Sequence, residues 1–145
     1  MKIIICNSTK FHALASKTKE ELEKLGHKAL MHPLECEFRG KKSHVIEQYN
    51  ARQNHWDEEL ADLKEFFMRE HFEKIKDSDA VLILNVDKDE KKNYVGGNTF
   101  LEMGLAFALN KKIFMLNPIP EEMPYAEEIK GMRPIVIYGD LSKVK

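Results

Sequence analysis

Runs of apolar residues alternate along the chain with longer segments in which apolar residues recur at helical spacing. Ile3–Ile5 is a continuous β-branched run, and Ala80–Leu84 is apolar at every position. Runs without alternation are typical of parallel strands that are buried on both faces. We therefore predict a central strand at each of these places.

Three shorter runs predict further strands, at Lys28–His32, Lys112–Leu116 and Pro134–Tyr138. Helical patterns lie between the strands: one carries Leu14, Leu22 and Leu25 and ends at Gly26, one leaves Gly96 and ends around Asn110, and Tyr125–Ile129 makes a helical turn. Parallel strands joined by helices need right-handed crossovers. The predicted fold is therefore a doubly wound α/β fold with a five-stranded parallel sheet, the flavodoxin-like strand order 2-1-3-4-5 and helices on both faces.

The segment Glu35–His55 is polar and shows no clear strand. A loop is expected around Gly40, and Ser43 is a candidate cap for a short helix through Val45, Ile46 and Tyr49. A longer helix is expected from about Trp56 to Ile75, with Trp56, Leu60, Leu63 and Phe67 on one face. An insertion of this length serves either as a lid or oligomer surface or as an ordinary helical connection.

Three polar segments follow the predicted central strands. In this strand order, ligands bind beyond the carboxyl ends of the first and third strands. The loops expected there are Asn7–Thr9 and Asn85–Asp87, and the helix start Gly96–Glu102 lies at the same edge. We therefore predict that three polar loops converge on one crevice.

Glu102 is the leading candidate for chemistry, and it has two interpretations. Thr99 and Glu102 match the S/T-x-x-E capping box, with Asn98 and Thr99 as an N-capping pair before an apolar stripe. That stripe comprises Phe100, Met103, Gly104, Phe107 and Ala108. A helix N-terminus also attracts anions, and Gly96-Gly97 suits positive φ or a close ligand approach. Capping and catalysis both stay open at this point.

The other polar residues at the crevice have the same two kinds of role. Asn85 and Asp87 end a central strand, where they either form a turn or contact a ligand. Asp87 also opens a run of charges that is typical of a solvated loop. Asn7 and Ser8 either bind a phosphate or sugar at a helix start or cap that helix.

Composition narrows the classes of function. The 145 residues fit one domain, residues 1–145, and the formal net charge is −1 with no basic block. Nucleic-acid polymers are therefore not expected as partners. No run is long enough for a signal peptide or a membrane span. Cys6 and Cys36 lack CxxC spacing, which favours free thiols and a cytoplasmic location.

Several kinds of cofactor chemistry lack their sequence signatures. The six histidines show no ligand spacing such as H-x-x-H or H-E-x-x-H, so no metal is expected. There is no G-x-S-x-G elbow, no Walker A motif and no glycine-rich first turn, which argues against NAD(P) and ATP. Flavin is less firmly excluded, and we expect no cofactor.

Residues 79–116 resemble the nucleoside 2-deoxyribosyltransferase-like superfamily, which includes nucleoside deoxyribosyltransferases and nucleoside 5′-monophosphate N-glycosidases. The matching segments are Asp79–Asp87, Gly96–Leu109 and Lys111–Ile113. The family's hallmark is a strand ending in an acidic loop, a G-x-x-x-E-x-G-x-A helix start and a lysine-bearing entry into the next strand; this chain has the E-x-G-x-A part at Glu102–Ala106.

The resemblance implies that Glu102 is a nucleophile, ionised at a helix N-terminus, that attacks the anomeric carbon of a ribosyl or deoxyribosyl group and forms a covalent glycosyl-enzyme. Asp87 would then bind substrate or handle the proton of the base, and a homo-oligomer is implied. The other implied substrate-binding residues are Asn7, Ser8, Asn85, Gly96, Gly97 and Asn98.

Two positions depart from the family pattern. Deoxyribosyltransferases carry an aspartate where this chain has Gly96, and many members have Gly or Ser where it has Asn98. The sequence therefore leaves two hypotheses: an enzyme that cleaves or transfers at the N-glycosidic bond of a small-molecule nucleoside or nucleotide, and a non-catalytic nucleotide-binding module.

Overall fold

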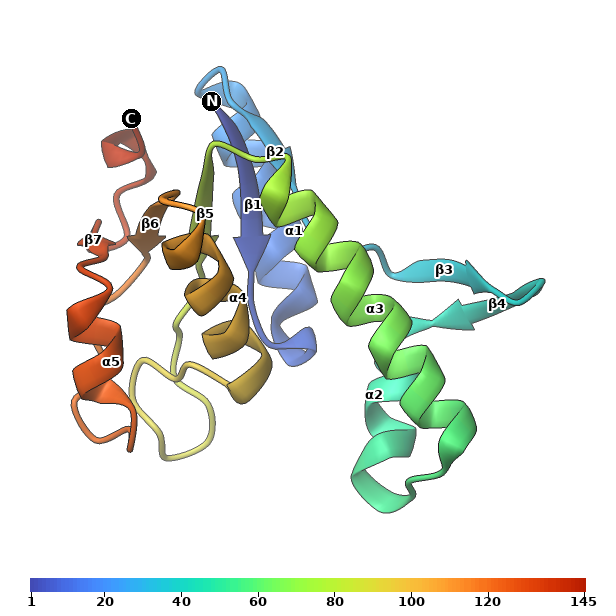
Figure 1. Ribbon diagram of the computed structural model, residues 1–145. Coiled ribbons are helices and arrows are strands. Elements are labelled where there is room, and N and C mark those ends of the chain that lie inside the picture. The colour runs from blue at the N-terminus through green and yellow to red at the C-terminus, as the bar shows by residue number, and fades with distance from the viewer.

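A five-stranded parallel sheet forms the centre of the computed structural model, which describes residues 1–145 (Figure 1). Along the sheet the strands are β2 (Lys28–Leu30), β1 (Lys2–Cys6), β5 (Ala80–Ile83), β6 (Lys112–Met115) and β7 (Ile135–Val136). All four neighbouring pairs are parallel. The doubly wound α/β class is confirmed. The numbering differs from the predicted 2-1-3-4-5 because two further strands, β3 and β4, lie outside this sheet.

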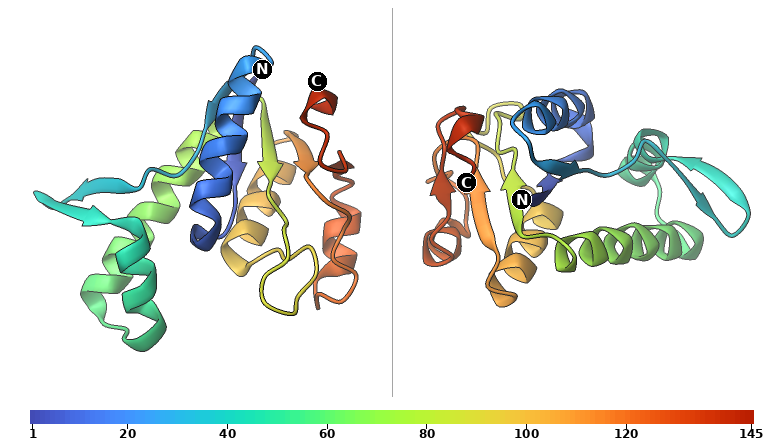
Figure 2. Two further views of the ribbon diagram at one scale, coloured as in Figure 1. Left: turned by 180° about the vertical axis from the view of Figure 1, so that it is seen from behind. Right: turned by 90° about the horizontal axis from the view of Figure 1, so that it is seen from above.

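Helices cover both faces of the sheet (Figure 2). On one face lie α1 (His12–Lys24), which follows the 3-10 turn η1 (Thr9–Phe11), and the C-terminal tail with η2 (Leu141–Lys143). On the other face lie α3 (Glu58–Lys76), α4 (Gly97–Ala108) and α5 (Ala126–Gly131). Strand β1 divides its side chains between the two cores, with Ile3 and Ile5 toward α1 and Ile4 and Cys6 toward α4. None of the helices combines the length and apolarity needed to cross a membrane.

The segment between β2 and β5 forms an arm that stands away from the sheet (Figures 1 and 2). It consists of the hairpin β3 (Glu35–Phe38) and β4 (Lys41–His44), the helix α2 (Val45–Asn54) and the first half of α3. The prediction of no strand here was wrong. Arg39 and Gly40 both have positive φ, 52° and 75°, which suits a two-residue hairpin turn. The strands are short and no residue in them is fully buried, so they lack a clear apolar pattern.

Two helix starts in the arm also differ from the prediction. Ser43 lies in β4, and His44 is the residue before α2, so Ser43 is not the cap. Helix α3 begins at Glu58, because the Asp57 side chain accepts a hydrogen bond from the Leu60 amide. Trp56 therefore precedes the helix and is 59% exposed instead of sharing the buried face.

Helix α4 begins three residues earlier than a capping box at Thr99 would allow. Gly96 is the flanking residue and Gly97 the first helical one, so Thr99 and Glu102 do not form a capping box. The buried face consists of Thr99, Glu102, Met103 and Ala106, whereas Phe107 of the predicted stripe is 53% exposed. Glu102 consequently lies in the second turn of the helix, on the side that faces the core.

Candidate active site

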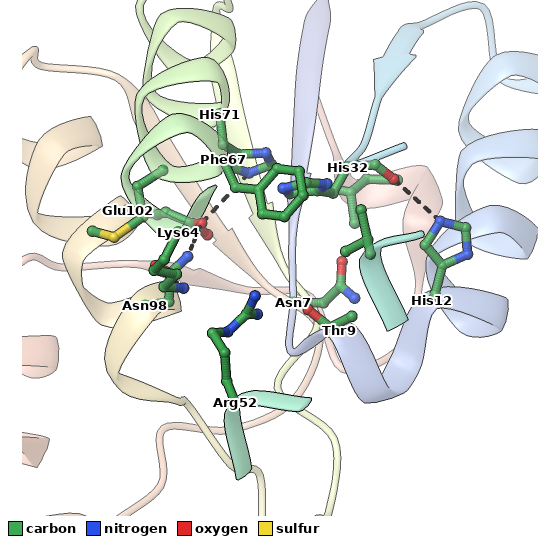
Figure 3. Close-up of a pocket in the computed structure, with 13 residues that line it drawn as sticks. Asn7, Thr9, His12, His32, Arg52, Lys64, Phe67, His71, Asn98 and Glu102 are labelled. Carbon is green, nitrogen blue, oxygen red and sulfur yellow. Dashed lines mark hydrogen bonds and ion pairs between the residues drawn. The ribbon is translucent and has the colours of Figure 1, made fainter. Parts of the chain in front are cut away.

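A pocket lies beyond the carboxyl end of β1, between the sheet and the arm (Figure 3). It contains about 550 Å³ of empty space including its mouth. Residues from β1, the turn after it, α2, α3 and α4 line it. Its polar and aromatic lining comprises Asn7, Thr9, His12, His32, Arg52, Lys64, Phe67, His71, Asn98 and Glu102.

Glu102 is the buried acid of this pocket, with 3% of its surface exposed. The side-chain amide of Asn98, one helical turn earlier, donates a 2.6 Å hydrogen bond to Glu102 Oε1. Lys64 Nζ donates in turn to Asn98 Oδ1 at 3.1 Å. Glu102 Oε2 is buried and has no partner. The carboxyl group is therefore held by one oxygen while the other is free to react or to bind.

Burial raises the pKa of Glu102 to about 8, and hydrogen bonds from Cys6 and Asn98 and the charge of Lys64 oppose this only in part. The expectation of a carboxylate ionised by the helix N-terminus is therefore corrected. Glu102 lies beyond the first turn, where the helix dipole is strongest, and it is desolvated. In the free protein at neutral pH, Glu102 is mostly protonated.

His71 lies between Glu102 and Cys6. Its Nε2 is 3.7 Å from Glu102 Oε1 and 3.6 Å from Cys6 Sγ, while its Nδ1 is buried without a partner. Burial, helped by His32 and Lys74, lowers the pKa of His71 to about 3. Burial also raises the pKa of the Cys6 thiol, followed by the effect of Glu102. At neutral pH these groups are uncharged, so the contact of His71 with Glu102 is not an ion pair.

Two cationic side chains point into the pocket from the arm and α3 (Figure 3). Arg52 of α2 is half-buried, and its Nη1 is buried without a hydrogen-bond partner. Burial lowers the pKa of both Arg52 and Lys64. An unpaired guanidinium nitrogen facing a cavity is a ready donor to an acceptor on a ligand.

The sequence singled out neither these cations nor His71. The only available signal for His71 was its place four residues after Phe67 on the buried face of α3. Nothing in the polar arm distinguished Arg52, because the side of α2 that faces the pocket depends on how the arm is placed.

Some of the predicted site residues meet in the pocket and others do not. Asn7 and Asn98 line it together with Glu102, and Thr9 lines it where Ser8 was expected. Asn7 Nδ2 donates to the Ser8 carbonyl at 2.8 Å. Asn85 lies elsewhere, because its buried side chain donates to the Asn117 and Pro118 carbonyls and accepts from the Asn117 amide. It ties the end of β5 to the end of β6.

Asp87 lies outside the pocket in an exposed loop. Its carboxylate accepts hydrogen bonds from Lys92 Nζ at 2.8 Å and from the Asn93 amide at 2.9 Å. Gly96 and Gly97 begin α4, and neither has positive φ. The prediction that three polar loops converge on one crevice is therefore corrected: the Asn7 turn and the α4 start meet, and the loop after β5 closes on itself.

Comparison of the sequence with protein-family models and with curated proteins gave no match. The structure is similar to a 2-deoxyribosyltransferase from the psychrotolerant bacterium Bacillus psychrosaccharolyticus, with a TM-score of 0.54, 15% identity and coverage of 94% of this chain and 98% of that one. It is also similar to the CMP N-glycosidase BcmB of Clostridium botulinum, with a TM-score of 0.52, 16% identity and coverage of 99% and 93%. The chain therefore shares the fold of these two enzymes, which are of the two kinds named in the resemblance of residues 79–116.

Proposed function

We propose that the protein cleaves or transfers at the N-glycosidic bond of a nucleoside or a nucleoside 5′-monophosphate, with Glu102 as the nucleophile. The observation that carries this proposal is a buried carboxyl group at the wall of a polar pocket, with Oε1 fixed by Asn98 and Oε2 free. The names of the structural neighbours support the same reaction class, although a shared fold alone does not assign an activity.

In the proposed reaction, the Glu102 carboxylate attacks the anomeric carbon of the sugar. The electron pair of the C–N bond leaves with the base, which takes up a proton, and a covalent glycosyl-enzyme remains. Water or a second base then displaces Glu102 from the sugar. Both transition states resemble an oxocarbenium ion, which an adjacent carboxylate stabilises. Asn98 serves this chemistry by holding the carboxylate in one orientation.

The remaining roles follow from positions in the pocket. We propose that Asn7 and Asn98, whose side chains line the cavity, contact the sugar. We propose that Arg52 donates a hydrogen bond from its unpaired Nη1 to an acceptor on the substrate. Asp87 is not assigned a catalytic role, because its carboxylate is engaged by Lys92 and Asn93 outside the pocket.

A non-catalytic nucleotide-binding module is the second candidate. It is favoured by the raised pKa of Glu102, since a protonated carboxyl group can donate a hydrogen bond to a ribose hydroxyl but cannot attack carbon. The missing acid at Gly96 points the same way.

Release of free base separates the two candidates. The full chain is incubated with a panel of nucleosides and 5′-monophosphates, and products are separated by liquid chromatography. The enzyme hypothesis expects base release that Glu102→Gln abolishes and that the matched control Glu127→Gln, an exposed glutamate on α5, leaves intact. Mass spectrometry should detect a sugar adduct on the peptide of residues 96–104. Saturable binding without turnover by the folded wild type would instead establish the binding module.

A homo-oligomer and a cytoplasmic location are further parts of the proposal. The arm supplies a surface for self-association, with the exposed Trp56 grouped with the α3 residues Met68 and Phe72. Both cysteines are free, as a reducing compartment would require.

A further inference from the structure

Cys6, His71 and Glu102 form a buried cluster of three potential metal ligands. They come from the end of β1, from α3 and from α4, and their exposed fractions are 0%, 3% and 3%. One ligand atom from each lies within 4.8 Å of the other two. The sequence showed no histidine spacing typical of a metal site, and no metal was predicted. The three ligands are far apart in the sequence and are brought together only when α3 and α4 pack on the sheet.

The two distances from His71 Nε2 to the other ligand atoms are close to those of a tetrahedral zinc site. Zinc bonds are about 2.3 Å to a thiolate and about 2.0–2.2 Å to imidazole nitrogen or carboxylate oxygen. In a tetrahedron such bonds separate the ligand atoms by roughly 3.3–3.6 Å. His71 Nε2 lies 3.6 Å from Cys6 Sγ and 3.7 Å from Glu102 Oε1. The third pair, Cys6 Sγ and a Glu102 oxygen, lies within 4.8 Å, so side-chain movements of about an ångström bring all three atoms to one ion.

The hydrogen-bonding state of the cluster also points to a ligand. Glu102 Oε2 is buried without a partner, which is rare for a polar atom in a folded core and leaves one carboxylate oxygen available to an ion. If Zn²⁺ binds, the Cys6 thiol and the Glu102 carboxyl group each release one proton to solvent, and His71 binds through Nε2 with its hydrogen on Nδ1. Two positive charges enter and two leave, so the buried site keeps its net charge.

We propose that Cys6 Sγ, His71 Nε2 and the Glu102 carboxylate bind one Zn²⁺ ion. His71 and Glu102 line the pocket, so the ion has an entry path and a fourth position that water can occupy. A thiolate, an imidazole and a carboxylate favour zinc over the hard cations Mg²⁺ and Ca²⁺. One consequence rests on the proposed function: zinc withdraws the carboxylate that attacks the sugar, so Zn²⁺ inhibits base release and a chelator restores it.

Binding is tested on the reduced, chelator-treated full chain, independently of activity. Isothermal titration with Zn²⁺ should give one tight site, and Mg²⁺ should give none. Co²⁺ in place of Zn²⁺ should produce a thiolate-to-cobalt charge-transfer band and intense visible bands of a tetrahedral ion. Cys6→Ser should remove the charge-transfer band, and both Cys6→Ser and His71→Ala should weaken binding by about tenfold or more. Cys36→Ser, which changes the second free cysteine of the protein, on β3, should leave the charge-transfer band and the zinc affinity unchanged.

Two outcomes overturn the site. One is a folded wild-type protein that binds no Zn²⁺ or gives a cobalt spectrum without a thiolate band, a result that needs no core variant to fold. The other is binding that survives in folded Cys6→Ser but disappears in Cys36→Ser. Base release is measured separately with chelator present. Zinc binding without base release rejects the proposed function alone, and base release without zinc binding rejects the metal site alone.

Discussion

The Asn98 amide donates to Glu102 Oε1 at 2.6 Å, and the oxygen of the same amide accepts from Lys64 Nζ. Asn98 therefore connects the buried carboxyl group with the nearest cation of the pocket. The residues at positions i and i+4 of α4 lie on the same side of the helix, which lets the amide fix the carboxyl group without strain. This position is one of the two at which the chain departs from the family pattern.

Replacing Asn98 by Ala should lower the rate of base release by about 10- to 100-fold, because a hydrogen bond to a charged group is worth about 1.5–3 kcal/mol. The substitution also removes an interaction that lowers the pKa of Glu102. The rise of the rate with pH should therefore move to higher pH. A pH–rate profile of the variant beside the wild type measures both effects. An unchanged midpoint would show that Asn98 does not act on the carboxyl group.

The rate of base release should increase with pH until Glu102 is ionised. The free-enzyme pKa of about 8 makes the carboxylate a minor species at pH 6 and the major one at pH 9. Since kcat/KM reports groups of the free enzyme, its profile should rise through pH 8 in the presence of chelator. A profile that is flat from pH 6 to pH 9 would contradict the assignment of Glu102 as an ionised nucleophile.

Stability should also depend on pH, with opposite contributions from His71 and Glu102. His71 is neutral in the fold down to about pH 3 but charges near 6.5 when unfolded, so its contribution is lost as pH falls below 6.5. Glu102 keeps its proton in the fold up to about pH 8 but loses it near 4.5 when unfolded, so stability falls as pH rises between these values. Each slope is at most about 1.4 kcal/mol per pH unit.

Between pH 4.5 and 6.5 the contributions of His71 and Glu102 to the free energy of unfolding oppose each other. Between pH 6.5 and 8 only the contribution of Glu102 changes, so the protein becomes less stable as the pH rises. Glu102→Gln removes the ionisable group while keeping the shape of the side chain. We expect this variant to be more stable than the wild type at pH 8, and to lack the decline above pH 6.5. Urea unfolding at several pH values in the presence of chelator provides the measurement. A parallel decline in both proteins would assign it to another group.

The sheet could be predicted from the sequence because its strands are continuous apolar runs, such as Ile3–Ile5, that suit only a doubly covered parallel sheet. The β3–β4 hairpin could not be predicted, because its strands are only partly buried and therefore show no alternating apolar pattern in the sequence. The glycines and capping residues before Glu102 identified it as a candidate. Its burial could not be predicted, because it depends on the helix beginning at Gly97, which places Glu102 in the second turn on the buried face. The contact of Cys6 with His71 spans 65 residues and has no local signature.

Trp56 should contribute to self-association, because its indole is 59% exposed beside an apolar part of α3 that includes Ala61, Met68 and Phe72. Light scattering after size-exclusion chromatography should show an oligomer for the wild type and a smaller species for Trp56→Glu. Tyr138→Glu is the matched control, since Tyr138 is 69% exposed and follows β7, which lies at the end of the sheet away from the arm (Figure 1). A monomeric wild type would reject the oligomer, and equal shifts in both variants would reject the role of Trp56.

Arg52 should act on substrate binding and not on the chemical step. Its Nη1 is buried without a partner, and it reaches the pocket from the arm, apart from the Lys64–Asn98–Glu102 chain of hydrogen bonds. Arg52→Met should therefore raise KM by about 10- to 100-fold with little change in kcat, which is the pattern of a contact equal in ground and transition states. Arg69→Met, at an exposed arginine on α3 paired with Glu65, should change neither constant.

Comparing nucleosides with 5′-monophosphates in the Arg52 variant identifies the group that Arg52 binds. If the guanidinium binds the phosphate, KM should rise only for the monophosphates, because a nucleoside offers no anion to lose. If it binds an acceptor on the base or sugar, both substrate classes should lose affinity by the same factor. A fall in kcat with KM unchanged would contradict both assignments and would place Arg52 on the reacting atoms instead.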